Sequence, residues 1–158
     1  PESIRVAPSF MSIESDIVLL ESCPTFQILG RELLRVLAIS SEQLDFARGD
    51  VLFRSGDEAD CGYVVSRGAF RVSFVDGSSH EMIAGRGALI GELALIVSMQ
   101  RPATAISLEF SSVIRIHRQL FVRVLDSDPA AARRLRDEIA GRTSQATSDI
   151  IFVGAKLG

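Results

Sequence analysis

The chain has 158 residues, of which 47% are hydrophobic and 23% charged, so it can bury one core and is too apolar to be disordered. Its formal net charge of −3 argues against a dedicated nucleic-acid binder, which usually presents a basic face. Two cysteines, Cys23 and Cys61, and two isolated histidines, His80 and His117, are too few for a disulfide framework or a metal centre.

The N-terminal third of the chain predicts an extended arm followed by helices. Residues 1–14 contain two prolines and little periodicity, so we interpret them as a linker or arm. Apolar residues then recur at helical spacing from Ile13 to Leu37. The pair Cys23-Pro24 interrupts this pattern, which indicates two short helices with a break at the proline.

After Ser41 the apolar pattern changes to period two, which is typical of strands with one buried face. Glycine and aspartate, as in Gly56-Asp57 and Asp76-Gly77, separate the runs and supply the residues that tight turns need. The alternating runs lie at 44–46, 51–53, 70–74, 106–108 and 114–116. Many short strands at close intervals predict an antiparallel sheet structure of about eight strands.

Helical spacing returns at the C-terminal end. One short helix is predicted around Leu120 to Leu125, and Asp128-Pro129 supplies a cap and a first-turn proline for a second helix. Residues 143–158 form a C-terminal helical extension or tail that is apolar enough to pack against another surface. The fold class is therefore α+β, a jelly-roll-like antiparallel β-roll flanked by N-terminal and C-terminal helices.

The stretch GRGALIGELALIVSMQRPATA, residues 85–105, contains the glycines of a candidate phosphate site. Its spacing GxGxxxG is one residue too long for a dinucleotide fingerprint, and it lies among strands rather than in a strand–helix–strand unit. The pattern GxxxxGK[ST] does not occur in the sequence, so a P-loop is excluded as well.

A different chemistry fits the same stretch. Gly91 precedes a short predicted helix, and glycine allows a ligand to approach the backbone closely. The carboxylate of Glu92 can accept a hydrogen bond from a sugar hydroxyl, while the guanidinium of Arg101 can bind and neutralise a phosphate. Alternatively, Glu92 only complements a helix dipole and Arg101 is only solvated. A ligand that carries a ribose hydroxyl and one phosphate would use both residues.

The stretch also resembles a known motif. Gly91-Glu92-Leu93-Ala94-Leu95, five further residues and then Arg101-Pro102-Ala103-Thr104-Ala105 are similar to the phosphate-binding cassette of the cyclic nucleotide-binding domain family. The resemblance implies a domain over residues 15–142 with its cassette at 91–105. Glycines at 49, 56, 68 and 87, together with Phe53, Tyr63 and Phe121, match turn and core positions of the same family.

The resemblance implies a role for each cassette residue. Glu92 would bind the ribose 2′-hydroxyl with help from the Gly91 backbone, and Arg101 would bind the cyclic phosphate with help from N–H groups near Ala94. Leu89 and Ile90 would line the pocket. The set of candidate ligand-binding residues is therefore Leu89, Ile90, Gly91, Glu92, Leu93, Ala94, Arg101, Pro102 and Ala103.

Pro102 departs from the family pattern, which has Ala, Ser or Thr after the arginine. Proline has no backbone N–H, so one hydrogen bond to the phosphate would be missing, at a cost of about 1 kcal/mol. A threonine at this position favours cGMP in the family, and Pro102 cannot replace its hydroxyl. We therefore expect cAMP as the ligand rather than cGMP.

These observations predict a cytoplasmic regulatory domain that binds a cyclic nucleotide and moves its C-terminal helices in response. The alternative is a domain of the same fold that has lost the ligand and serves as a structural or protein-interaction module. We expect no catalytic residues, metal or cofactor, no nucleic acid as partner and no membrane segment. An effector domain outside this chain is an expected partner, and the apolar tail leaves a homodimer open.

Overall fold

The computed structural model describes residues 4–5, 12–75, 80–143 and 150–151. Its N-terminal helical segment consists of α1 (Ile13–Glu21), the 3-10 helix η1 (Pro24–Phe26) and α2 (Arg31–Ser40). The hydroxyl of Ser12 caps α1 by accepting a hydrogen bond from the Ser15 N–H at 3.0 Å. Pro24 stands in the first turn of η1, so the predicted break between two helices is confirmed.

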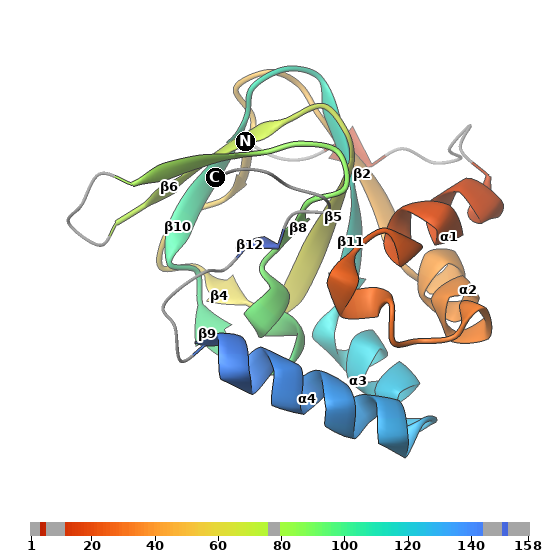
Figure 1. The fold of residues 1–158 in the computed structure, drawn as a ribbon. Coiled ribbons are helices and arrows are strands. Elements are labelled where there is room, and N and C mark those ends of the chain that lie inside the picture. Colours follow the sequence, from red (N-terminus) through yellow and green to blue (C-terminus); the bar gives the residue numbers. More distant parts are fainter. Residues whose placement is uncertain (1–3, 6–11, 76–79, 144–149, 152–158) are drawn as a thin grey trace.

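Antiparallel strands form the centre of the molecule (Figure 1). The first sheet has, in spatial order, β1 (Ile4–Arg5), β2 (Glu42–Phe46), β11 (Ser111–His117), β5 (Cys61–Arg67), β8 (Leu89–Ile90) and β12 (Ile150–Ile151). The second has β3 (Val51–Phe53), β10 (Ala103–Ser107), β6 (Phe70–Phe74) and β7 (Glu81–Ala84), and β4 (Glu58–Ala59) pairs with β9 (Met99–Gln100). The described strands outnumber the expected eight, because strands of two residues are too short to show an alternating apolar pattern in the sequence.

The C-terminal helices are α3 (Arg118–Asp126) and α4 (Pro129–Thr143). The Asp128 carboxylate accepts a hydrogen bond from the Ala131 N–H at 3.2 Å, which confirms the predicted cap. Figure 1 shows that the helices of both ends gather beside the β-roll. The predicted fold class, an α+β fold with an antiparallel β-roll between terminal helices, is therefore confirmed.

Two apolar clusters hold these layers together. One lies between the helices and the first sheet, where Phe26 of η1 and Phe121 of α3 meet edge to face with ring centroids 5.7 Å apart. The other fills the β-roll, where Phe46 and Phe70 make a similar contact at 5.6 Å. The strand β8 belongs to both, because Leu89 lies in the helical cluster and Ile90 in the roll cluster.

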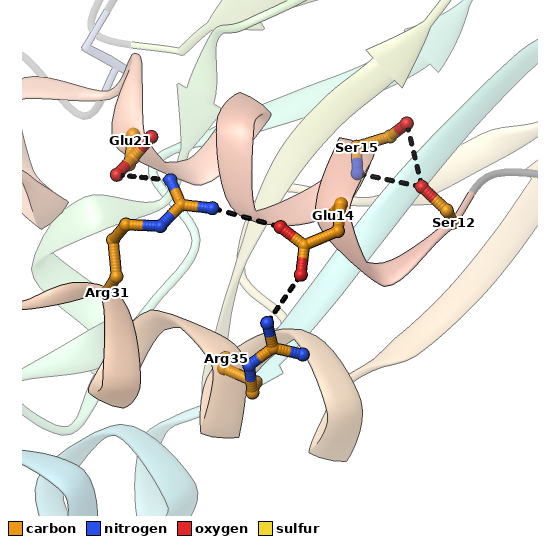
Figure 2. Close-up of polar contacts among 6 residues, drawn as sticks. All are labelled: Ser12, Glu14, Ser15, Glu21, Arg31 and Arg35. Atoms are coloured by element: carbon orange, nitrogen blue, oxygen red, sulfur yellow. Dashed lines mark hydrogen bonds and ion pairs between the residues drawn. The ribbon is translucent and has the colours of Figure 1, made fainter.

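A surface network of charges joins the first two long helices (Figure 2). Arg31 of α2 donates to Glu14 at 3.0 Å and to Glu21 at 2.9 Å, both on α1, and Arg35 also donates to Glu14. These side chains are exposed, so each pair contributes at most about 1 kcal/mol. The network therefore adds little to the stability of the fold.

Candidate functional site

Gly91 is the point where β8 turns into the 3-10 helix η2 (Glu92–Leu95). Its φ of 83° lies in the left-handed region that favours glycine. A Cβ atom at this position would lie 2.5 Å from Nη1 of Arg101 and 3.4 Å from the Cys61 carbonyl oxygen. A side chain would therefore displace the arginine, which explains why the cassette needs glycine here.

The guanidinium of Arg101 is buried beside Gly91, and the residue is only 4% exposed. Nη2 donates to the Cys61 carbonyl oxygen at 2.8 Å, and the Cys61 sulfur lies 3.4 Å away. The rings of Phe53 and Tyr63 lie 4.4 Å and 5.4 Å from the guanidinium carbon and hold it by cation–π contacts. Nη1 is buried without a hydrogen-bond acceptor among the described residues.

The unpaired Nη1 donor of Arg101 indicates a place where an acceptor could bind. A buried polar group without a partner costs roughly 1–3 kcal/mol, and more when it carries charge. The Phe53 ring contacts one face of the Arg101 guanidinium, but its Nη1 atom still lacks a hydrogen-bond acceptor among the described residues. An anion beside Gly91 would supply that acceptor and neutralise the charge.

The backbone of Arg101 is fixed by the turn between β3 and β4. The Arg101 N–H donates to the Asp57 carbonyl at 2.8 Å, and the Gly56 N–H donates to the Arg101 carbonyl at 2.8 Å. The Asp57 carboxylate closes the turn by accepting from the Arg54 N–H at 3.0 Å. This explains the position of the sequence pair Gly56-Asp57, whose backbone in this turn holds the backbone of Arg101 in place.

Glu92 is buried at the start of η2, with 4% of its surface exposed. The hydroxyl of Thr25, in η1, donates a hydrogen bond to its Oε2 atom. Cys23 is close enough for the Glu92 charge to affect it: burial and that charge raise the pKa of the Cys23 thiol to about 12. Sequence reasoning missed Thr25, because no local pattern marks a contact between residues so far apart in the chain.

The other candidate residues lie on both sides of the same strand and helix. Ile90 faces the roll and remains a candidate for lining a pocket, whereas Leu89 lies in the helical cluster. The Ala94 N–H donates to the Gly91 carbonyl at 3.1 Å and is already engaged. Pro102 is half-buried and its carbonyl accepts from the Val75 N–H at 3.4 Å, while Ala103 is buried in β10. Leu93 is half-buried and packs against the helical cluster.

Arg118, the first residue of α3, joins the C-terminal helices to the cassette. Its Nη1 atom donates to the carbonyl oxygens of Ala94 at 2.9 Å, Val97 at 3.0 Å and Ala59 at 3.0 Å. Its backbone N–H also donates to the Asp60 carbonyl at 2.8 Å. A movement of η2 would therefore change the hydrogen bonds of Arg118 at the start of α3.

The end of the described chain also reaches the cassette. β12 pairs antiparallel with β8, with Ile150 opposite Ile90 and Ile151 opposite Leu89. Two residues of the expected C-terminal extension thus form a strand directly beside the residues that precede Gly91 (Figure 1).

Two further properties concern the whole described part of the chain. The described residues contain no group of three or more His, Cys, Asp or Glu side chains that could hold a metal ion. In the same residues, every helix is too short or too polar to cross a membrane.

The sequence matches the family described as Cyclic nucleotide-binding domain over residues 43–128. The chain belongs to the cyclic nucleotide-binding domain family. A cyclic nucleotide-binding-like protein from Brucella abortus shares 36% identity, with a TM-score of 0.62, and the alignment covers 70% of this chain and 97% of that one. The matched residues run from β2 to just past the end of α3 and include the cassette.

More distant members differ in length and context. The cAMP-dependent protein kinase regulatory subunit of Debaryomyces hansenii is 30% identical over 122 residues, which cover 70% of this chain and 26% of that protein. The chain thus spans about a quarter of this curated relative. The regulatory domain of Toxoplasma gondii PKA, solved with cAMP, has a TM-score of 0.70 at 21% identity, covers 85% of this chain and 50% of that one, and so supports the fold.

Proposed function

We propose that this domain binds a cyclic nucleotide, cAMP in preference to cGMP, and acts as a regulatory module without catalysis of its own. The observation that supports this best is the buried Nη1 atom of Arg101, which has no acceptor among the described residues. A cyclic phosphate beside Gly91 would accept from it and neutralise the guanidinium. The family membership and the cassette sequence agree with this ligand.

In this proposal the two charged cassette residues bind different groups of the ligand. Arg101 binds the phosphate and Glu92 accepts a hydrogen bond from the ribose 2′-hydroxyl. Gly91 provides the backbone surface, with Ile90, Leu93, Ala94 and the half-buried Pro102 around it. Pro102 supplies no N–H to the phosphate and no hydroxyl to a guanine, which supports cAMP over cGMP.

The proposed output is a shift of the C-terminal helices. Ligand contacts would tighten the cassette, and the hydrogen bonds of Arg118 to Ala94 and Val97 transmit that change to α3. A ligand shifts this equilibrium only as far as it prefers one arrangement over the other. The effector on which the helices act is a partner outside this chain.

Isothermal titration with cAMP tests the proposal. We expect the wild-type domain to bind and Arg101→Lys to lose at least about tenfold in affinity, because lysine keeps the charge and loses the planar guanidinium that bonds the phosphate. The matched control is Arg67→Lys, since Arg67 also lies over an aromatic ring, Phe110, at 4.9 Å but belongs to the far end of β5. Equal affinity in wild type and Arg101→Lys contradicts the proposal.

A second candidate function is an interaction module of the same fold without a ligand. One observation favours it: Pro102 lacks the backbone N–H that a phosphate would otherwise use as a donor. Thermal melting with millimolar cAMP and cGMP separates the two functions. A ligand that binds only the native state raises the melting temperature, whereas an unchanged melting temperature with both nucleotides selects the interaction module.

A further inference from the structure

Thr25 connects the N-terminal helices to the cassette. It lies in η1 with no exposed surface, and its hydroxyl donates to Oε2 of Glu92. Its neighbours fix its position: Pro24 restricts the backbone before it, and Phe26 after it packs on Phe121 of α3. The hydroxyl is therefore presented to Glu92 by a buried segment that packs against α3.

This contact sets the geometry of the carboxylate before a ligand arrives. Glu92 has three side-chain torsions, and holding them in one arrangement costs conformational entropy. A buried hydrogen bond to a charged oxygen is one of the stronger contacts in a protein. Each carboxylate oxygen can accept two hydrogen bonds, so the bond from Thr25 is compatible with another donor at the same carboxylate.

We propose that Thr25 is a positioning residue for ribose recognition. Its hydroxyl holds the Glu92 carboxylate in the orientation that accepts a hydrogen bond from the 2′-hydroxyl of the ligand. The inference rests on the proposed function, because it assigns Glu92 to the ribose. It adds a residue outside the cassette and links η1 to the sugar of the ligand.

The link also has a thermodynamic consequence. If the Thr25 hydroxyl strengthens binding of the ribose, binding of the ribose strengthens the contact between η1 and η2 by the same free energy. Because Phe26 of η1 packs against Phe121 of α3, the same segment touches the C-terminal helices. The N-terminal helices are then part of the response to ligand and not only a cover for the roll.

The experiment compares two ligands and three proteins. Affinities for cAMP and 2′-deoxy-cAMP are measured by titration calorimetry on wild type, Thr25→Val and Thr25→Ser. We expect Thr25→Val to lose about tenfold in affinity for cAMP and less than twofold for 2′-deoxy-cAMP, because only cAMP donates to Glu92 through a 2′-hydroxyl. Thr25→Ser keeps the hydroxyl and should retain the wild-type ratio of the two affinities.

The ratio distinguishes positioning from packing. Valine has nearly the shape of threonine, and urea unfolding of each variant confirms that it is folded at the titration temperature. If Thr25→Val loses the same affinity for both ligands, or gains affinity for cAMP, the positioning role of Thr25 is wrong. Binding of cAMP by the wild-type domain would still support the proposed function. A wild-type domain that binds neither ligand overturns both. Thr25→Ser is the informative variant if Thr25→Val does not fold, and a ratio unlike that of wild type overturns the inference.

Discussion

At the scale of single residues, the site depends on how closely Arg101 approaches the backbone of Gly91. The arginine is held on its other side by Phe53 and Tyr63, whose rings stack with centroids 5.9 Å apart. Its Nη2 atom is bound to the Cys61 carbonyl, which leaves Nη1 to face Gly91. The absence of a side chain at Gly91 is therefore what allows the charged guanidinium to lie against the backbone at this position.

Gly91→Ala tests this arrangement. The methyl group would lie 2.5 Å from Nη1, and alanine would have to adopt a left-handed φ of 83°. We expect the free energy of unfolding to fall by about 1–2 kcal/mol from backbone strain, and cAMP affinity to fall at least about tenfold because the guanidinium is displaced. Urea unfolding and titration calorimetry measure the two effects separately.

Gly85→Ala is the matched control for that substitution. Gly85 belongs to the same stretch, but an added Cβ would meet nothing within 4 Å, and its φ is outside the left-handed region. We expect its stability to change by no more than about 0.5 kcal/mol and its cAMP affinity to stay within twofold. Similar losses in both variants would show that the close approach of Arg101 to Gly91 is not what the site depends on.

At the scale of elements, one arginine side chain connects the cassette helix to α3. The last carbonyl groups of a helix lack partners within it, and Arg118 binds the carbonyl of Ala94 in η2 and that of Val97, two residues after η2. The same nitrogen reaches Ala59 of β4, so three elements meet at one guanidinium. Arg118 is therefore a direct polar connection between the cassette and the C-terminal helices.

Arg118→Met should loosen that connection. Methionine keeps much of the aliphatic stem but donates no hydrogen bond, so we expect a loss of roughly 1–3 kcal/mol in stability. Faster hydrogen exchange should appear at the amides of Ile96 and Val97, which close the last turn of η2 on the Leu93 carbonyl. Arg123→Met, an exposed position on the same helix, is the control, and equal exchange in both variants would contradict a specific role for Arg118.

At the scale of the whole molecule, local patterns predicted most of the fold. The period-two runs became β2, β3, β6, β10 and β11, and Asp128-Pro129 begins α4. The two-residue strands could not be predicted, because two residues define no period and their pairing depends on distant partners. The roles of Glu92 and Arg101 could be predicted, because both belong to the local cassette motif. The contacts of Thr25 and Arg118, and the ring contacts with Arg101, could not be predicted, because they also depend on distant partners. Those contacts join residues that lie 21 to 67 positions apart.

The first sheet also makes the stability of the whole domain depend on pH. Glu42 of β2 lies opposite Arg115 of β11, whose Nε and Nη2 atoms donate to it at 2.7 Å and 2.5 Å, and His117 lies 3.2 Å away. Burial disfavours the charged carboxylate, but the Arg115 hydrogen bond and charge, with those of His117, lower the pKa of Glu42 below its ordinary value of 4.5. The folded state thus binds a proton at Glu42 less readily than the unfolded state does.

The consequence for acid unfolding follows from that difference. Stabilisation by Glu42 is fully present above about pH 4.5, the ordinary value, and is lost as the pH falls through the lower folded pKa. Glu42→Gln should cost about 1 kcal/mol at pH 7, because the pair is partly exposed, and the difference from wild type should shrink below pH 4.5. Urea unfolding at pH 7, 5, 4 and 3 measures it, with Glu58→Gln, an exposed carboxylate on β4, as the control. A difference that stays constant from pH 7 to 3 would mean that Glu42 stabilises the sheet by its shape and not by its charge.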